Sequence, residues 1–376
     1  MTCPRLLYAA SESSADMLYA LGFMLPDPAL WYEINGKPTV VVSPLELGRA
    51  RREARPEVQI KATETLRKEL GLDSAKPGGM SEVITALSKQ CDVKKWQVPY
   101  DFPGGLVVSL AANHIEIDPV RDFWPQRRYK ETGEIDAIRE GVGLAQQGLE
   151  HAFRILREAV ADAEEKLIWR GQPLTSEILR GEINAEIARA GGTASHTIAA
   201  PGRQAADPHC TGYGQILLNQ PIVIDIFPRV NATGYHGDLT RTVVKGRGAD
   251  IVQRAFATVN AAREAAIKAV NPGVAAPEVH EAAAATIRDR GFATDVSSAT
   301  PSGFIHGVGH GLGLEVHEAP RLNTRSDTRL AAGDVITIEP GLYYPDWGGM
   351  RIEDVLVVTE DGSRNLTSAP ISLELD

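Results

Sequence analysis

Apolar residues recur every three or four positions between Ile135 and Val160, which predicts one long amphipathic helix. Three further helices are expected after it, each stopped by Gly or Pro signals. They run from Ser176 to Gly191-Gly192, over 249–270 before Asn271-Pro272-Gly273, and over 276–290 before Gly291. Strand-like runs cover residues 196–200, 221–229, 235–244, 334–344 and 350–359. This part of the chain is therefore predicted to be α+β, with strands joined mainly by hairpins.

The first part of the chain has a different pattern, with shorter runs of apolar residues. A helix is predicted to start at Ser14. Two strand-like runs, Trp31–Ile34 and Thr39–Val42, flank the turn pair Asn35-Gly36 and predict a β-hairpin. Leu106–Leu110 is expected to form a further strand. These elements predict a smaller α/β unit.

The charged stretch Arg121–Glu134, which contains Pro125, separates the two patterns. A chain of 376 residues is long for one hydrophobic core. We therefore expect two domains, an N-terminal domain over residues 1–128 and a C-terminal domain over residues 129–376.

Composition and charge exclude several classes of protein. The net charge of -10 argues against nucleic acid as a partner, since phosphate binding needs clustered Lys and Arg, and the basic stretch Gln126–Lys130 is short. Cys3, Cys91 and Cys210 are scattered, which indicates reduced thiols in a cytoplasm. The apolar run Leu6–Ala10 is too short for a signal peptide, and no uninterrupted apolar window is long enough for a membrane span. We expect a cytoplasmic protein without membrane partners.

Three carboxylates interrupt strands that are otherwise apolar. Asp225, Glu339 and Glu353 each lie within such a run. An ionised carboxylate in a buried strand is costly unless it is paired or binds a metal. One such acid could belong to a buried salt bridge, but three in separate strands indicate a shared cation.

Two more candidate ligands follow from their surroundings. The turn signal Asn231–Gly234 predicts a hairpin that brings Asp238 onto the strand beside Asp225. His310 lies in the glycine-rich stretch His306–Glu318, where the backbone can come close to a site.

The charge of these five residues predicts two divalent ions. Four carboxylates and a neutral histidine carry about −4, which two divalent cations balance and one does not. Mostly oxygen ligands with one imidazole favour Mn²⁺, with Co²⁺, Fe²⁺ or Zn²⁺ as alternatives. A two-metal site suits hydrolysis, because it holds a bridging hydroxide and polarises the carbonyl under attack.

The order Asp, Asp, His, Glu, Glu resembles that of the pita-bread metallopeptidases, a family that includes methionine aminopeptidase, aminopeptidase P and prolidase. Four stretches carry the resemblance: Gly234–Thr242, His306–Glu318, Thr337–Tyr343 and Arg351–Asp354. The resemblance implies a C-terminal pita-bread catalytic domain preceded by a smaller N-terminal domain of the creatinase/prolidase type.

The resemblance also implies roles for the metal ligands. Asp238 and Glu353 would bridge the two metals. Asp225 would complete the site of one metal, and His310 with Glu339 the site of the other. Glu339 would also be the general base that takes a proton from the bridging water.

Further residues match the family's substrate side. His209, His306 and His317 match its histidines, and His209 and His317 would stabilise the tetrahedral oxyanion. Arg351 would share a strand face with Glu353 and orient it. Arg321 resembles an arginine with which some prolidases hold the free carboxylate of a dipeptide's proline; the alternative is an exposed surface arginine.

The implied activity is hydrolysis of the peptide bond before proline, in Xaa-Pro dipeptides or at peptide N-termini. The expected substrate is a small peptide with proline after the scissile bond, and the expected assembly is a homodimer. Two alternatives remain open: a creatinase-like amidinohydrolase that works without metal, and a non-catalytic pita-bread binding protein.

Three positions depart from the family's pattern. Asp225 and Asp238 are 13 residues apart, where the family usually has 11. Phe227 stands where the family usually has glycine, and His236 would share a strand face with Asp238. A fourth histidine, His196, precedes an apolar strand and is expected to be structural.

Overall fold

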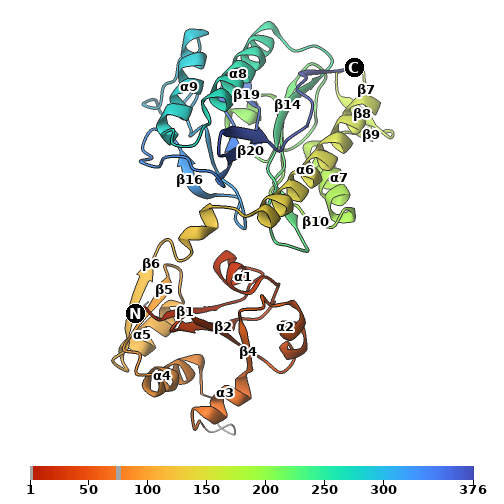
Figure 1. Cartoon of the computed structure of the whole chain (residues 1–376). Helices are drawn as coiled ribbons and strands as arrows, with labels where there is room; N and C mark the ends of the chain where they lie inside the picture. Colours follow the sequence, from red (N-terminus) through yellow and green to blue (C-terminus); the bar gives the residue numbers. More distant parts are fainter. Residues whose placement is uncertain (1–2, 73–77) are drawn as a thin grey trace. The chain divides into compact units, whose positions relative to one another are not determined.

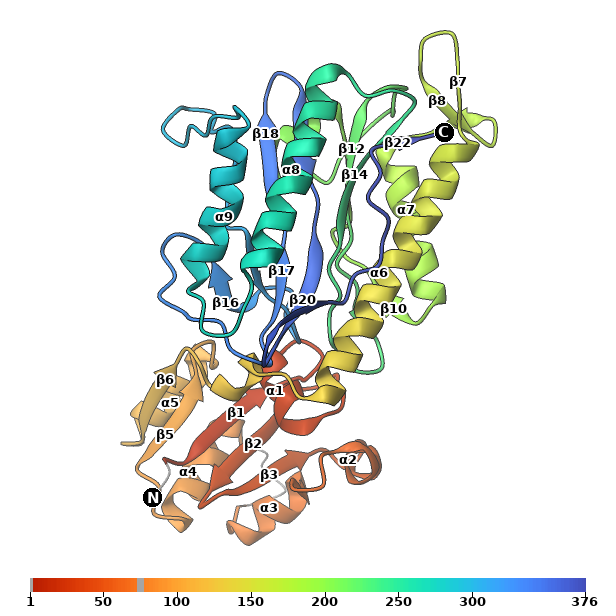
Figure 2. The ribbon, with the colours of Figure 1, turned by 45° about the horizontal axis from the view of Figure 1, so that its top comes forward.

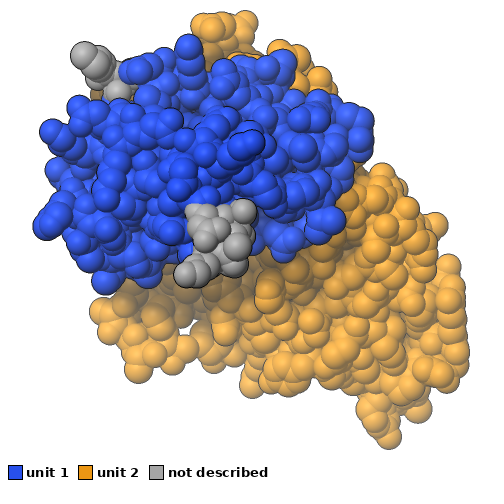
Figure 3. All heavy atoms as spheres, turned by 90° about the horizontal axis from the view of Figure 1, so that it is seen from below, with its two compact units in different colours: residues 1–127 blue, residues 128–376 orange. Residues whose placement is uncertain are grey.

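The computed structural model describes residues 3–72 and 78–376. The chain divides into two compact units, which Figure 3 colours separately: residues 1–127 and residues 128–376. No helix in the described part of the chain combines the length and the apolar character needed to span a membrane.

The described residues of the first unit form a six-stranded mixed sheet and five α-helices (Figure 1), and the strand order is β4-β3-β2-β1-β5-β6. The strands are β1 (Arg5–Ala9), β2 (Ala29–Ile34), β3 (Lys37–Val42), β4 (Gln59–Ala62), β5 (Lys95–Pro99) and β6 (Glu116–Val120). The helices are α1 (Ala15–Leu21), α2 (Leu47–Glu53), α3 (Thr63–Glu69), α4 (Met80–Gln90) and α5 (Gly104–Ala111).

The predicted hairpin in this unit is confirmed, because β2 and β3 pair antiparallel. Both turn residues have positive φ, 52° for Asn35 and 72° for Gly36, as a two-residue hairpin turn requires. The strand predicted at Leu106–Leu110 is wrong, since these residues lie in α5. A short apolar run does not distinguish a strand from a helix by its period, and here a helix forms.

The second unit contains the four predicted helices. They are α6 (Thr132–Glu158), α7 (Ser176–Arg189), α8 (Asp250–Ala269) and α9 (Ala276–Asp289). In Figures 1 and 2, α8 and α9 lie on one side of the strands, and α6 and α7 lie on the other. Each pair of helices buries its apolar face in a core cluster that it shares with the strands beside it.

The strands of the second unit form several small sheets. A four-stranded sheet has the order β11 (Ile198–Pro201), β12 (Pro221–Asp225), β14 (Thr240–Lys245) and β22 (Glu374–Leu375). A five-stranded sheet has the order β16 (Glu318–Leu322), β15 (Gly309–Gly311), β17 (Val335–Ile338), β20 (Asp354–Thr359) and β21 (Gly362–Asn365). The remaining strands pair as β10 (Gly192–Thr193) with β13 (Arg229–Val230), β18 (Gly341–Tyr344) with β19 (Gly348–Arg351), and β7 (Val160–Ala161) with β8 (Leu167–Trp169) and β9 (Gln172–Pro173).

Two strands that carry candidate ligands are shorter than predicted. Asp225 is the last residue of β12 and pairs with Thr240 of β14, so Asp238 precedes its strand by two residues. The backbone still runs alongside β12, since the amide of Ile226 donates to the carbonyl of Leu239 at 3.0 Å. The segment between Asp225 and Asp238 contains β13 and a turn at residues 231–233.

Candidate active site

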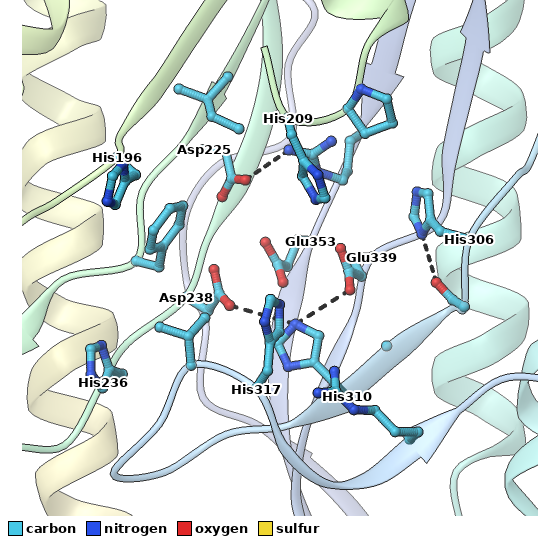
Figure 4. Close-up of a pocket in the computed structure, with 18 of the residues that line it drawn as sticks. His196, His209, Asp225, His236, Asp238, His306, His310, His317, Glu339 and Glu353 are labelled. Carbon is cyan, nitrogen blue, oxygen red and sulfur yellow. Dashed lines mark hydrogen bonds and ion pairs between the residues drawn. The ribbon is translucent and has the colours of Figure 1, made fainter. Parts of the chain in front are cut away.

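The second unit contains a cavity of about 800 Å³, which residues of both the four-stranded and the five-stranded sheet line (Figure 4). Its walls come from segments that are far apart in the sequence, between Ser195 and Glu353. All ten residues singled out from the sequence line it: His209, Asp225, Asp238, His306, His310, His317, Arg321, Glu339, Arg351 and Glu353.

The acids and His310 converge at the centre of this cavity. Ligand atoms of Asp238, His310 and Glu353 all lie within 4.8 Å of one another. The Nε2 atom of His310 is 3.4 Å from Oε1 of Glu339 and 3.8 Å from Oδ2 of Asp238. Asp225 faces the same space from the end of β12 (Figure 4). The geometry brings together five donors from five separate segments of the chain.

The buried acids repel one another, and their pKa values show it. Burial raises the pKa of Asp238 well above its usual range, and the charges of Asp225 and Glu339 add to this shift. Burial likewise raises the pKa of Glu353, with Asp238 as the next cause. The pKa of Glu339 rises to about 7 through burial, against the opposing charge of Arg351. Arg351 offsets only part of the negative charge of these four acids, and a bound cation would offset more of it.

His310 is prepared to act as a neutral nitrogen donor. Burial lowers its pKa to about 3, and the neighbouring His317 adds to this effect. Its Nδ1 atom lies 3.1 Å from the carbonyl oxygen of Gly311, and this contact fixes the ring and leaves Nε2 facing the acids. The ring of His317 packs edge-on against it, with centroids 4.4 Å apart.

Arg351 contacts a different acid from the one expected. Its Nη2 donates to Oδ2 of Asp225 at 2.7 Å, and its Nε donates to Oγ1 of Thr240 at 3.3 Å. Thr240 in turn donates to Oε2 of Glu353 at 2.8 Å. The prediction that Arg351 orients Glu353 directly is wrong, because β19 ends at Arg351 and β20 begins at Asp354, so Glu353 lies in a break between strands.

The substrate-side histidines lie around the acids. Nε2 of His306 is 2.9 Å from the hydroxyl of Tyr343, which also accepts a hydrogen bond from Nη1 of Arg351 at 2.8 Å. Burial lowers the pKa of His306 to about 4, so its ring is neutral at neutral pH. His209 is exposed in the loop before β12, and both it and His317 line the cavity.

Arg321 lies on β16 directly opposite His310 of β15. Arg321 is thus exposed, as a surface arginine would be, and also borders the cavity.

Some wall residues had no clear signal in the sequence. His196, expected to be structural, lines the cavity together with its neighbour Ser195. His196 has a φ of 60°, which a residue in a regular strand does not adopt. The strand pattern around it therefore did not predict where the side chain of His196 lies. Phe227 and His236, two of the departures from the family's pattern, also line the cavity. The only signal for these residues was their closeness in sequence to Ile198, Asp225 and Asp238.

The comparisons with known proteins agree with this geometry. The model of the metallopeptidase family M24 matches residues 136–360. An Xaa-Pro dipeptidase of Pyrococcus furiosus is 33% identical over 265 residues, which cover 70% of this chain and 72% of that protein. A probable dipeptidase PepE of Mycobacterium bovis is 31% identical over 353 residues, which cover 92% of this chain and 84% of that protein.

Among solved structures, an X-Pro aminopeptidase from Thermotoga maritima superposes with a TM-score of 0.81 at 22% identity, covering 99% of this chain and 97% of that one. This likeness confirms the predicted α+β fold with a C-terminal pita-bread domain. The family match over residues 136–360 and the two dipeptidase relatives show that the chain is an enzyme of metallopeptidase family M24.

Proposed function

We propose that this enzyme hydrolyses the peptide bond before proline, using two divalent metal ions. One observation supports this proposal above others: four carboxylates and a neutral histidine converge in one cavity that five further histidines and Arg321 also line. The similar proteins support the same proposal, since they include Xaa-Pro dipeptidases and an X-Pro aminopeptidase.

The donor set fits two divalent ions. The residues that would hold them are Asp225, Asp238, His310, Glu339 and Glu353. Among the described residues, Oδ1 of Asp225 is buried and has no hydrogen-bond partner, as expected for an oxygen whose partner is an ion. Four carboxylates and Arg351 sum to about −3, so one divalent ion leaves a net charge of about −1 and two leave about +1.

When bound, the ions would lower the pKa of a water molecule and polarise the substrate carbonyl. The oxygen-rich donor set favours Mn²⁺ among the candidate ions. We extend the proposal to a homodimer, which rests on the resemblance to prolidases.

The residues around the acids would complete the reaction. Glu339 would accept the proton of the attacking water and pass it to the prolyl nitrogen, which must be protonated to leave. His209 and His317 would donate hydrogen bonds to the oxygen that becomes negative in the tetrahedral intermediate. Neutral His306, held by the Tyr343 hydroxyl, would contact the substrate beside Glu339.

Arg321 favours a dipeptide over a longer peptide. A dipeptide that ends in proline has a free carboxylate next to the ring, and a guanidinium binds a carboxylate through two parallel hydrogen bonds. Arg321 lines the cavity and lies opposite His310 in the strand pair, which supports this role. A longer peptide has an uncharged amide at that point.

The experiment is hydrolysis of an Xaa-Pro dipeptide and of the matching Xaa-Pro tripeptide in the presence of Mn²⁺. We expect cleavage of the dipeptide and loss of activity in Glu339→Gln. Arg321→Met should reduce kcat/KM for the dipeptide by roughly 10- to 100-fold and affect the tripeptide little. Arg325→Met, an exposed arginine four residues away, is the matched control. Cleavage of neither peptide, with metal bound, would defeat the proposal; activity without any bound transition metal would favour creatinase-like chemistry.

A further inference from the structure

A buried ion pair lies just outside the cavity and has no role in the proposed chemistry. Nζ of Lys130 is 3.0 Å from Oε2 of Glu318, and the two side chains are only 1% and 7% exposed. Neither residue lines the cavity. A charge buried this deeply is stable only when it is paired, so each member depends on the other.

The carboxylate of Glu318 is attached on both sides. While Oε2 faces Lys130, Oε1 accepts a hydrogen bond from the amide of Glu315 at 3.1 Å. The short segment between Glu315 and Glu318 contains His317, whose ring packs on His310. The ion pair therefore holds the segment that presents His317 to the cavity.

The strand ladder does not hold this segment by itself. Arg321 of β16 is opposite His310, yet Glu318 is opposite the next residue, Gly311, so the register shifts between these two pairs. Ala319 and Pro320 are the additional residues of this bulge. The ladder resumes only at the Glu318–Gly311 pair, so this single pair and the side chain of Glu318 hold the end of β16 next to His317.

Lys130 provides a rigid base for that attachment. Its amide donates to the carbonyl of Gly333 at 2.8 Å. Two residues earlier, Arg128 binds Asp334 through two hydrogen bonds of 2.7 Å, and Asp334 is fully buried. The segment that carries Lys130 is thus anchored to the turn before β17.

We propose that Lys130 and Glu318 are positioning residues for the peptidase reaction, which hold His317 over the metal site across the bulge in β16. This inference rests on the proposed function, since it assigns His317 a part in the reaction. Lys130 acts through His317 and does not touch the substrate.

A double-mutant cycle with the full-length, Mn²⁺-loaded enzyme and an Xaa-Pro dipeptide tests the proposal. Lys130→Met should lower kcat/KM by about 10- to 100-fold, chiefly in kcat, because a small displacement of a catalytic group is costly. In a His317→Ala background the same substitution should change kcat/KM by less than about 2-fold, since its target is already absent. A merely structural role predicts the same loss in both backgrounds, and that result would overturn the proposal.

Three further variants make the outcome clear. Glu318→Gln retains the shape of the side chain and removes its charge. If Lys130→Met does not fold, Glu318→Gln takes its place in the same double-mutant cycle. Lys130→Arg should recover part of the activity, because it restores the charge. Lys166→Met, which breaks an exposed ion pair with Glu164 in the same unit, is the matched control and should leave kcat/KM unchanged. If the wild-type enzyme were inactive, the proposed function would be refuted. If it were active but Lys130→Met caused the same loss with and without His317, only this inference would be refuted.

Discussion

Helix α6 and the segment that carries Asp238 are in backbone contact at Gly141 and Gly237. A Cβ placed on Gly141 would lie 2.4 Å from the amide nitrogen of Gly237, and one placed on Gly237 would lie 2.2 Å from the carbonyl oxygen of Gly141. Side chains at these two positions would therefore force the segments apart. The approach sets the depth at which Asp238 enters the cavity.

We expect Gly141→Ala to lower the free energy of unfolding by about 1–3 kcal/mol, because the methyl group meets backbone that does not yield easily. Since the displaced segment carries Asp238, Mn²⁺ should also bind more weakly. Gly143→Ala is the control on the same helix, where an added Cβ meets no atom within 4 Å. That variant should be neutral or more stable by up to about 1 kcal/mol. Urea denaturation and calorimetric Mn²⁺ titration check both; equal behaviour of the two variants would contradict the argument.

Arg351 links three parts of the site, Asp225, Thr240 and Tyr343, through the separate nitrogens of its guanidinium. A lysine retains the charge but loses the planar fork, so it cannot keep all three contacts. We expect Arg351→Lys to reduce kcat/KM or Mn²⁺ affinity by about 10- to 100-fold, as for other residues that orient metal ligands. Kinetics at saturating and at limiting Mn²⁺ separate the two effects.

Arg364→Lys, on the exposed part of β21, is the control for this substitution and should leave both quantities unchanged. If Arg351→Lys retained wild-type values for activity and metal binding, the contacts of the Arg351 guanidinium would not be needed for either.

Sequence reasoning succeeded where a local pattern has one physical meaning. The period of apolar residues predicted α6, and Asn35-Gly36 predicted the β2–β3 hairpin, because each pattern strongly favours one structure. Asp225 and Glu339 stood out because a carboxylate within an apolar strand requires a compensating partner. The cavity brings these candidates together.

It failed where the structure depends on tertiary contacts. Lys130 and Glu318 are 188 residues apart, and nothing near either residue in the sequence marks the other as its partner. The actual contact of Arg351 was missed because a two-residue period holds only within a regular strand, and the chain leaves the strand before Glu353. Leu106–Leu110 was too short for its period to exclude a helix.

A second buried charge cluster predicts a large effect on stability. Asp354 accepts a hydrogen bond from Nη2 of Arg241 at 2.8 Å and another from Nη1 of Arg263, and all three residues are buried. Asp354→Asn would remove the nearest counter-charge of two buried guanidinium groups, so we expect a loss of about 3–5 kcal/mol in the free energy of unfolding. Asp361→Asn, on an exposed turn, should change it by less than about 0.5 kcal/mol. Urea denaturation of both variants measures these changes, and similar midpoints of unfolding for Asp354→Asn and Asp361→Asn would contradict the prediction.

The raised pKa values of the buried acids predict that Mn²⁺ binding releases protons, and that Glu339 contributes to this release only at lower pH. A carboxyl group whose pKa is about 7 retains its proton at about pH 6 and must lose it to bind a cation, whereas at about pH 8.5 it is already ionised. His310, with a pKa of about 3, has no proton to lose at either pH. Mn²⁺ affinity should therefore rise between these two pH values while the number of protons released falls. Calorimetry in two buffers of different ionisation enthalpy measures that number, and Glu339→Gln should remove up to about one proton from the release at the lower pH. If Glu339→Gln left the proton release at about pH 6 unchanged, Glu339 would already be ionised before the metal binds.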